Sequence, residues 1–294
     1  MGNYMSVAIL TDTNSGIFEE EGQKAGISVI PMPVIVDGKS YLENQTIDHS
    51  QLYAAMRRDC DISTSQPAPQ TYIEMWDKLL GEGYDEVVFI PMSSGLSTTC
   101  LTAQQFAKDY GGRVIVVDNH RISLTLRESV YDAKALADGG KSGQEIKERL
   151  EQNAYNACIY IAVNSMKYLV KNGRAGRSTA TIATALNIKP VLSISGEKLD
   201  AYKKVRGMKK AVEVMIESVA NDLKTRFSDV PRQRVVVGSA GTLERQEEVD
   251  ECVNALKAAF PGYQVYYNPL SCSIACHVGI GAIGMGISIK TPMD

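Results

Sequence analysis

The residues best able to do chemistry in this chain lie in four polar turns, each of which follows or interrupts an apolar, strand-like run. The turns read TDTNSG, STSQPAP, PMSSGLSTT and CHVGIG. In an α/β sheet, ligands gather outside the carboxyl ends of the strands, where loops present hydroxyls and free backbone N–H groups at helix starts. Three of the four turns are placed for that role, which makes them the first candidates for a binding site.

The turn from Ser93 to Thr99 comes directly before a predicted helix. Its hydroxyls and N–H groups could therefore bind an anion such as a carboxylate or a phosphate. The alternative is that Ser97 or a neighbour only caps the helix and the rest are ordinary loop residues. The turn lacks the GxxxxGK[ST] spacing of a P-loop, so nucleoside triphosphate binding is not supported.

The chain has only three histidines, His49, His120 and His277, so histidine-dependent chemistry must choose among them. His277 is the best candidate because it lies in a glycine-rich segment, where backbone can approach a ligand closely. A structural or surface role is still the more common fate of a histidine. A serine paired with His277 would also suggest a hydrolase, but the G-x-S-x-G elbow is absent, because Met92 stands two residues before Ser94, and no orienting acid is identifiable.

The cysteines do not form a recognisable framework. There are six, at positions 60, 100, 158, 252, 272 and 276, scattered through a long chain, whereas disulfide frameworks are typical of short secreted proteins. We expect them to be reduced. Cys272 and Cys276 beside His277 suggest a metal, but no second Cys or His pair completes four ligands, so we expect no metal.

The composition is that of a folded, water-soluble protein. Of 294 residues, 44% are hydrophobic and 22% are charged, close to the usual values for globular proteins. The net charge of -3 does not attract a phosphate backbone, which argues against nucleic acid as the main partner. Neither a signal peptide nor a run of about 18 apolar residues is recognisable, so we expect a cytoplasmic protein without a membrane segment.

The elements that must position the turns alternate between strands and helices. Buried-strand patterns at MSVAILTDT, DEVVFI and RVIVVDN are separated by helical patterns, which indicates a parallel sheet. Asp37-Gly38 indicates a hairpin turn. The character of the sequence changes after the helical segment SGQEIKERLEQN, and we place a boundary there, giving α/β domains at 1–155 and 156–294, the second with a mixed sheet flanked by helices.

Six segments together make the chain resemble the DegV family over essentially its whole length. They are the strand with TDTNSG, the TSQPAP loop, the PMSSGLSTT turn, VIVVDN, the GR segment followed by LNIKPVL, and the terminal IACHVGIGAIG. They occur in the order and approximate spacing of that family. Six matches in register are far more specific than any one alone.

The resemblance implies two α/β domains with an apolar tunnel near their interface that holds a long-chain fatty acid. Family members include the fatty-acid-binding subunit of bacterial fatty acid kinase, which presents the carboxylate to a separate kinase. Carried over to this sequence, Thr64, Ser93 or Ser94, and His277 would contact the carboxylate. Arg174 would face the kinase or the acyl phosphate. The resemblance further implies a monomeric carrier that is not itself catalytic and needs no cofactor.

Two residues depart from the family pattern. Ile280 replaces the proline of the usual H-x-G-P-G motif, and Thr98 stands where glycine is usual. The segment KNGRAGRS also replaces a more common GGRIS-like run. Thr98 needs a negative φ, whereas glycine does not. Together these departures bear on the head-group contacts and on the partner surface. Two alternatives to the carrier stay open: a Ser/His-dependent acyl ester hydrolase, and a carrier of another amphiphile.

Overall fold

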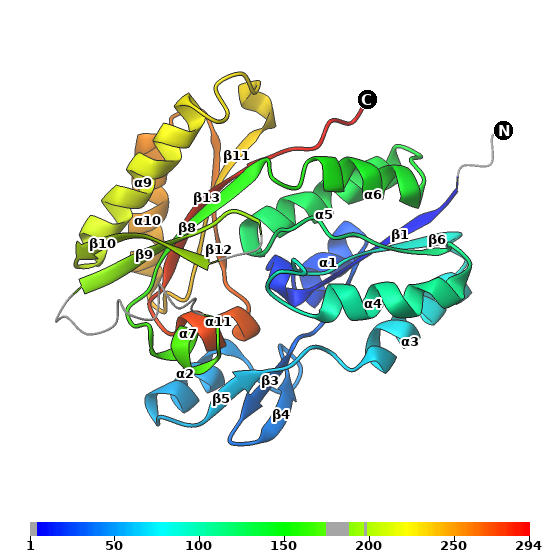
Figure 1. Cartoon of the computed structure of the whole chain (residues 1–294), viewed down its shortest axis with the longest axis horizontal. Helices are drawn as coiled ribbons and strands as arrows, with labels where there is room; N and C mark the ends of the chain where they lie inside the picture. The colour runs from blue at the N-terminus through cyan, green and yellow to red at the C-terminus, as the bar shows by residue number, and fades with distance from the viewer. Residues whose placement is uncertain (1–4, 175–187, 197–198) are drawn as a thin grey trace.

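A computed structural model describes residues 5–174, 188–196 and 199–294, which form three sheets and the helices around them (Figure 1). The strands are β1 Val7–Asp12, β2 Ile27–Ile30, β3 Pro33–Val36, β4 Lys39–Leu42, β5 Ile62–Thr64, β6 Glu86–Ile90, β7 Val114–Val116, β8 Ala157–Ala162, β9 Ile188–Ile194, β10 Leu199–Arg206, β11 Val235–Gly241, β12 Gln264–Pro269 and β13 Ile283–Ile289. The α-helices are α1 Glu19–Ala25, α2 His49–Arg57, α3 Pro69–Gly81, α4 Thr99–Ala107, α5 Ser123–Asp138, α6 Gly143–Gln152, α7 Lys167–Lys171, α9 Met208–Lys224, α10 Gln246–Ala259 and α11 Cys272–Val278.

The first half of the chain forms a four-stranded sheet in the order β2-β1-β6-β7, and every pair in it is parallel. Successive side chains of a strand point to opposite faces, and both faces of this sheet are covered. Ile9, Val88 and Ile115 pack with α5 and α6 on one face. Leu10 and Phe89 pack with α3 and α4 on the other. The parallel sheet predicted from the alternation of strands and helices is therefore confirmed.

A small antiparallel sheet in the order β4-β3-β5 lies below the first sheet in the view of Figure 1. Its β3–β4 hairpin turns at Asp37 and Gly38, both with positive φ (49° and 77°), as a two-residue turn of type I′ requires. Val34 and Ile62 of this sheet pack against α2 and against α11, which comes from the far end of the chain. The small sheet therefore brings the turn after β5 close to α11.

The second half forms a six-stranded mixed sheet in the order β10-β9-β8-β13-β11-β12, in which only the β11–β12 pair is parallel. Helices α9 and α10 cover one face, where Tyr160 and Ala162 point. The opposite face presents Ile159 and Ile161 toward α11 and the start of α5. The predicted class, an α/β protein with a parallel and a mixed sheet, is confirmed. All strands of the mixed sheet lie after residue 156.

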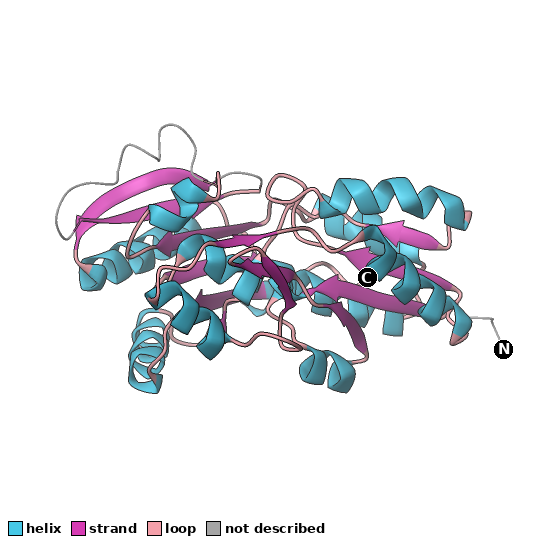
Figure 2. Cartoon of the chain, turned by 90° about the horizontal axis from the view of Figure 1, so that it is seen from below, coloured by secondary structure: helices cyan, strands magenta, loops and turns pink. Residues whose placement is uncertain are grey.

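The two large sheets lie side by side along the longest axis of the molecule (Figures 1 and 2). Helix α5 contacts both of them (Figure 1). Arg121, just before α5, is buried where the two halves meet. Its guanidinium donates to the carbonyl oxygens of Ala154 and Asn153 and to the hydroxyl of Ser288, at 3.1, 2.5 and 2.9 Å. Desolvation lowers its pKa to about 10, so it stays charged. Throughout the described ranges, the helices are too short or too polar to cross a membrane.

Candidate ligand-binding site

A cavity of about 390 Å³ lies where the loops of the parallel sheet, the small sheet, α11 and the mixed sheet meet. This volume is within the usual range of pockets for small molecules, roughly 300 to 1,000 Å³. Because the elements around it come from distant parts of the sequence, the cavity forms only when the chain is folded.

One part of the cavity wall is apolar and comes mainly from a single face of the mixed sheet. The contributing residues include Ile159, Ile161, Ile194, Leu199, Ala240 and Gly284 of the sheet, with Leu270, Ile274 and Val278 at α11. Successive residues of these strands point to opposite faces of the sheet. One set therefore forms the cavity wall, and the alternate set packs in the core against α9 and α10. Such a wall can hold a long hydrocarbon chain without exposing it to water.

The polar part of the wall combines residues from all four of the turns singled out in the sequence. Thr64 and His277 meet there: the threonine Oγ1 lies 2.9 Å from the imidazole Nε2, a hydrogen bond between residues 213 positions apart. Ser94 and Gln66 also line the cavity. Hydroxyl, imidazole and amide groups at one end of an apolar cavity can bind a carboxylate or another small polar head group.

His277 is neutral at pH 7. Burial, and then the positive charge of Arg174, lower the pKa of its imidazole to about 4. Its Nδ1 atom is buried and has no hydrogen-bond partner among the described residues. A protonated imidazole is therefore disfavoured in the folded protein, although a nearby anion would raise this pKa.

This neutral histidine predicts a specific loss of stability in acid. The folded protein protonates His277 only below about pH 4, whereas the unfolded chain does so below its ordinary value of 6.5. Stability from this group is therefore present above pH 6.5 and falls as the pH drops, by about 2 kcal/mol between pH 7 and pH 5. Urea unfolding of wild type and His277→Gln at both pH values measures it. Equal pH dependence in the two proteins would contradict it.

Helix α11 holds His277 in place because both of its ends are defined. The Ser271 hydroxyl accepts a hydrogen bond from the N–H of Ile274 at 3.3 Å and so caps the start of the helix. Gly279 ends it with a φ of 75°, and a Cβ atom there would lie 2.8 Å from the ring of Tyr168. Only glycine fits at this position, so the glycine after His277 is a packing requirement.

The Ser93–Ser94 turn is held by its backbone. The N–H of Ser93 donates to the carbonyl oxygen of Arg121 at 2.9 Å, and that of Ser94 donates to Asp118 Oδ1 at 3.2 Å. Ser94 lines the cavity. Ser93 is fully buried, does not line it, and accepts the N–H of Gly95 at 3.2 Å. Of the two serines that the family pattern offered, Ser94 is thus the one whose position allows contact with a ligand.

Asp12 joins two of the polar turns at the carboxyl end of β1. Its two carboxylate oxygens accept the N–H groups of Asn14 and Met92, at 2.9 and 3.1 Å. Complete burial raises the pKa of this carboxyl to about 6, although the two backbone hydrogen bonds favour the carboxylate and lower it. The aspartate thereby fixes the spacing between the TDTNSG turn and the Ser93–Ser94 turn.

The two departures from the family pattern fit their surroundings. Thr98 has a φ of -76°, which any residue adopts, and its hydroxyl donates to Gln66 Oε1 at 2.9 Å, linking two turns of the cavity. At Ile280, the carbonyl oxygen accepts the side-chain N–H of Asn164 at 3.1 Å, and Gly281 follows with a φ of 74°. Neither substitution strains the backbone of the site.

Arg174 is exposed and also lines the cavity, so this residue lies at the boundary between the cavity and solvent. One of its nitrogens, Nη1, donates to the carbonyl oxygen of Asn172 at 3.0 Å. The remainder of the GR segment, residues 175–187, lies outside the described residues. Arg174 is therefore the part of this segment that can be related to the cavity.

Asn14 is a cavity residue that the sequence did not single out. Its side-chain oxygen accepts hydrogen bonds from the hydroxyls of Ser271 and Ser273, the former at 3.3 Å. Its Nδ2 is buried and has no partner among the described residues, and the residue lines the cavity. A buried N–H donor without an acceptor is costly, so a bound ligand is its natural partner. The TDTNSG turn was the available signal, but its spacing did not show which side chain faces inward.

The geometry gives no support to a Ser/His hydrolase. The hydroxyl hydrogen-bonded to His277 belongs to Thr64, and within the described ranges neither Ser93 nor Ser94 bonds to this imidazole. The other ring nitrogen, Nδ1, has no hydrogen-bond partner in the part of the chain that the structure describes, so no carboxylate there orients it. An imidazole with a pKa of about 4 is also a weak general base at neutral pH.

Comparison with known proteins places this architecture in a family. A family model described as an uncharacterised protein of the DegV family matches residues 6–290. A DegV domain-containing protein of Deinococcus radiodurans is 31% identical over 284 residues, covering 96% of this chain and 98% of that protein.

Two solved structures have the same fold. A fatty-acid-binding DegV family protein from Thermus thermophilus is 27% identical with a TM-score of 0.83, covering 97% of this chain and 100% of that one. DegV, a fatty acid binding protein from Bacillus subtilis, is 26% identical, with the same TM-score and the same coverage. On the match across nearly its whole length, the chain described here belongs to the DegV family.

Proposed function

We propose that this protein binds a long-chain fatty acid, with the acyl chain along the apolar wall and the carboxylate at the Thr64–Ser94–His277 end of the cavity. The observation that carries the proposal is the cavity itself, because it combines a hydrocarbon-lined wall with a compact group of hydroxyl, amide and imidazole groups. The fatty acid binding of the solved relatives from Thermus thermophilus and Bacillus subtilis supports it.

The two ends of the ligand would contribute differently. Each buried methylene group contributes about 0.8 kcal/mol, so a long acyl chain supplies most of the affinity. Hydrogen bonds to a charged group contribute about 1.5 to 3 kcal/mol each and depend on direction. The polar end would therefore set the orientation of the acid and select the carboxylate over other head groups. The unpaired Nδ2 of Asn14 offers one more donor on the same wall.

The experiment that tests the proposal is lipid extraction from the gently purified protein, followed by mass spectrometry. We expect a long-chain fatty acid at about one per chain, because a ligand held by this much buried hydrocarbon dissociates slowly. A protein that carries no lipid and also fails to bind oleate would refute the proposal. A sterol or another amphiphile in the extract would instead show that the cavity serves a different ligand.

We further propose that the bound carboxylate is presented to a separate fatty acid kinase in the cytoplasm, with this chain acting as a monomeric, non-catalytic carrier. Arg174 supports this idea because it is both exposed and part of the cavity wall, where it could attract a phosphate. With a fatty acid kinase and ATP, Arg174→Ala should retain the fatty acid but lower acyl phosphate formation. Unchanged formation would remove Arg174 from the proposal.

A further inference from the structure

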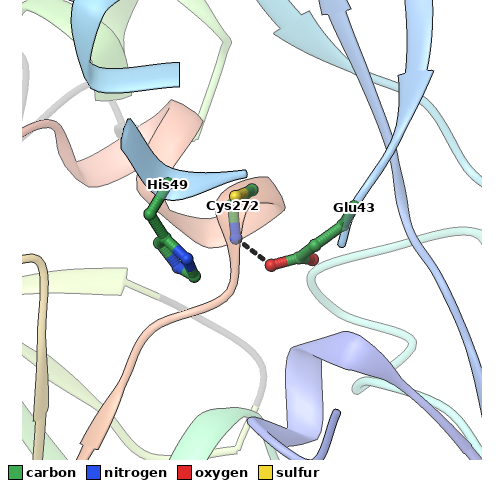
Figure 3. Close-up of side chains that lie close together, drawn as sticks. All are labelled: Glu43, His49 and Cys272. Carbon is green, nitrogen blue, oxygen red and sulfur yellow. Dashed lines mark hydrogen bonds between the residues drawn. The ribbon is translucent and has the colours of Figure 1, made fainter. Parts of the chain in front are cut away.

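Three side chains with metal-binding atoms converge outside the cavity, between the small sheet and α11 (Figure 3). Glu43 follows β4, His49 is the first residue of α2, and Cys272 is the first residue of α11. One ligand atom from each residue lies within 4.8 Å of the other two. None of the three lines the fatty acid cavity, so the proposed function does not account for their proximity.

Glu43 is the least expected member of this cluster, because its carboxylate is buried with 1% of the residue exposed. Its oxygens accept the hydroxyl of Thr13 at 2.7 Å and the backbone N–H of Cys272. No lysine or arginine among the described residues forms an ion pair with it. Buried carboxylates are usually paired with a cation or bound to a metal, and the nearby imidazole and thiol are both metal ligands.

His49 makes the kind of backbone hydrogen bond that metal-binding histidines usually make. Its Nε2 lies 2.7 Å from the backbone carbonyl oxygen of Leu270. A carbonyl only accepts hydrogen bonds, so Nε2 carries the proton and the lone pair of Nδ1 is not used by that bond. A backbone carbonyl holding the other ring N–H is the common outer partner of a histidine that binds a metal. Edge contacts with the rings of Phe18 and Tyr53 further restrict the imidazole.

The three donors define the kind of ion. A thiolate, an imidazole and a carboxylate are a ligand set typical of Zn²⁺, whereas Mg²⁺ and Ca²⁺ prefer oxygen ligands alone. Three protein ligands leave one tetrahedral position for water, and His49, unlike the buried Glu43 and Cys272, is partly exposed. We propose that Glu43, His49 and Cys272 form a binding site for Zn²⁺.

The position of this site gives it a consequence for the cavity. Glu43 and His49 belong to the segment that packs with β5, whose last residue is Thr64, while Cys272 begins the helix that carries His277. An ion at the cluster would tie together the two segments that carry Thr64 and His277. Zn²⁺ would thus stabilise the packing on which the polar end of the cavity depends.

The test uses the full chain, stripped with a chelator and titrated with Zn²⁺ against a chromophoric competitor, and with Cd²⁺ while the ultraviolet thiolate-to-metal absorption is recorded. We expect one Zn²⁺ per chain and a thiolate band with Cd²⁺. Cys272→Ser should abolish the band and weaken Zn²⁺ binding at least about tenfold. Losing only an outer-shell partner of a metal ligand already weakens metal binding by about 10- to 100-fold, so losing a ligand should cost no less. Cys276→Ser, a buried cysteine one turn along the same helix, is the matched control and should keep both.

Absence of Zn²⁺ binding, or a thiolate band that survives in Cys272→Ser, would overturn the proposal. Should Cys272→Ser fail to fold, His49→Gln, at a partly exposed position, must weaken Zn²⁺ binding for the proposal to stand. The titration needs no fatty acid, and lipid extraction needs no metal. Failure of the zinc site and failure of fatty acid binding can therefore be told apart.

Discussion

Replacing Ala240 with phenylalanine is expected to lower the affinity for stearate by more than about 100-fold. Ala240 is a small residue of β11 that forms part of the apolar wall of the cavity. A phenyl ring there would displace roughly four methylene groups of the acyl chain, and at about 0.8 kcal/mol each this costs about 3 kcal/mol. Fluorescent fatty acid displacement or calorimetry measures the loss.

A shorter acid and a small substitution at the same position provide the controls. Laurate has a shorter chain than stearate and therefore more room in the cavity, so it should lose less affinity than stearate in Ala240→Phe. Ala240→Gly adds no bulk and should bind stearate normally, although glycine in a strand lowers stability slightly. If Ala240→Phe weakened laurate and stearate equally, the ring would be acting through misfolding or through the head-group end, and the assigned chain path would be wrong.

Thr64→Val is expected to lower the affinity for oleic acid by about 10- to 100-fold and to leave that for oleyl alcohol nearly unchanged. Valine keeps the shape of threonine but removes the hydroxyl that lies 2.9 Å from Nε2 of His277. A lost hydrogen bond to a charged group costs about 1.5 to 3 kcal/mol, and the alcohol carries no charge. The ratio of the two affinities, measured by displacement of the same probe, therefore reports on the head-group contact alone.

Thr98→Val is the matched control for this second prediction. Thr98 also lines the cavity, but its hydroxyl donates to Gln66 and not to His277. It should keep most of the preference for the acid, whereas Thr64→Val should lose it. Should both variants keep that preference, the carboxylate would have to lie elsewhere in the cavity, with the Asn14–Ser273 region as the next polar candidate.

Much of the fold could be predicted from local patterns. The β-branched run of β1 and the Asp37-Gly38 turn indicated a buried strand and a hairpin, and the structure has both. These features depend on residues close together in the chain, where side-chain period and backbone preference act directly. The pattern could not show that β3, β4 and β5 form a separate sheet against α11, because that contact joins the two ends of the sequence.

The candidate site divides in the same way. The sequence by itself determined which turns carry hydroxyls, that His277 lies among glycines, and, through the six ordered segments, the family resemblance. Only the tertiary structure decided that Ser94 and not Ser93 lines the cavity, and that Thr64 bonds to His277 across 213 positions.

Tertiary structure also decided the charge state and the remaining partners of the site. Burial beside Arg174 makes His277 neutral. Close packing leaves Asn14 Nδ2 without a partner among the described residues and brings Glu43, His49 and Cys272 together. Desolvation and contact depend on what the fold brings together from distant segments. Residue types and spacing therefore determined which groups were available, and the packing of three sheets around α11 determined which of them meet.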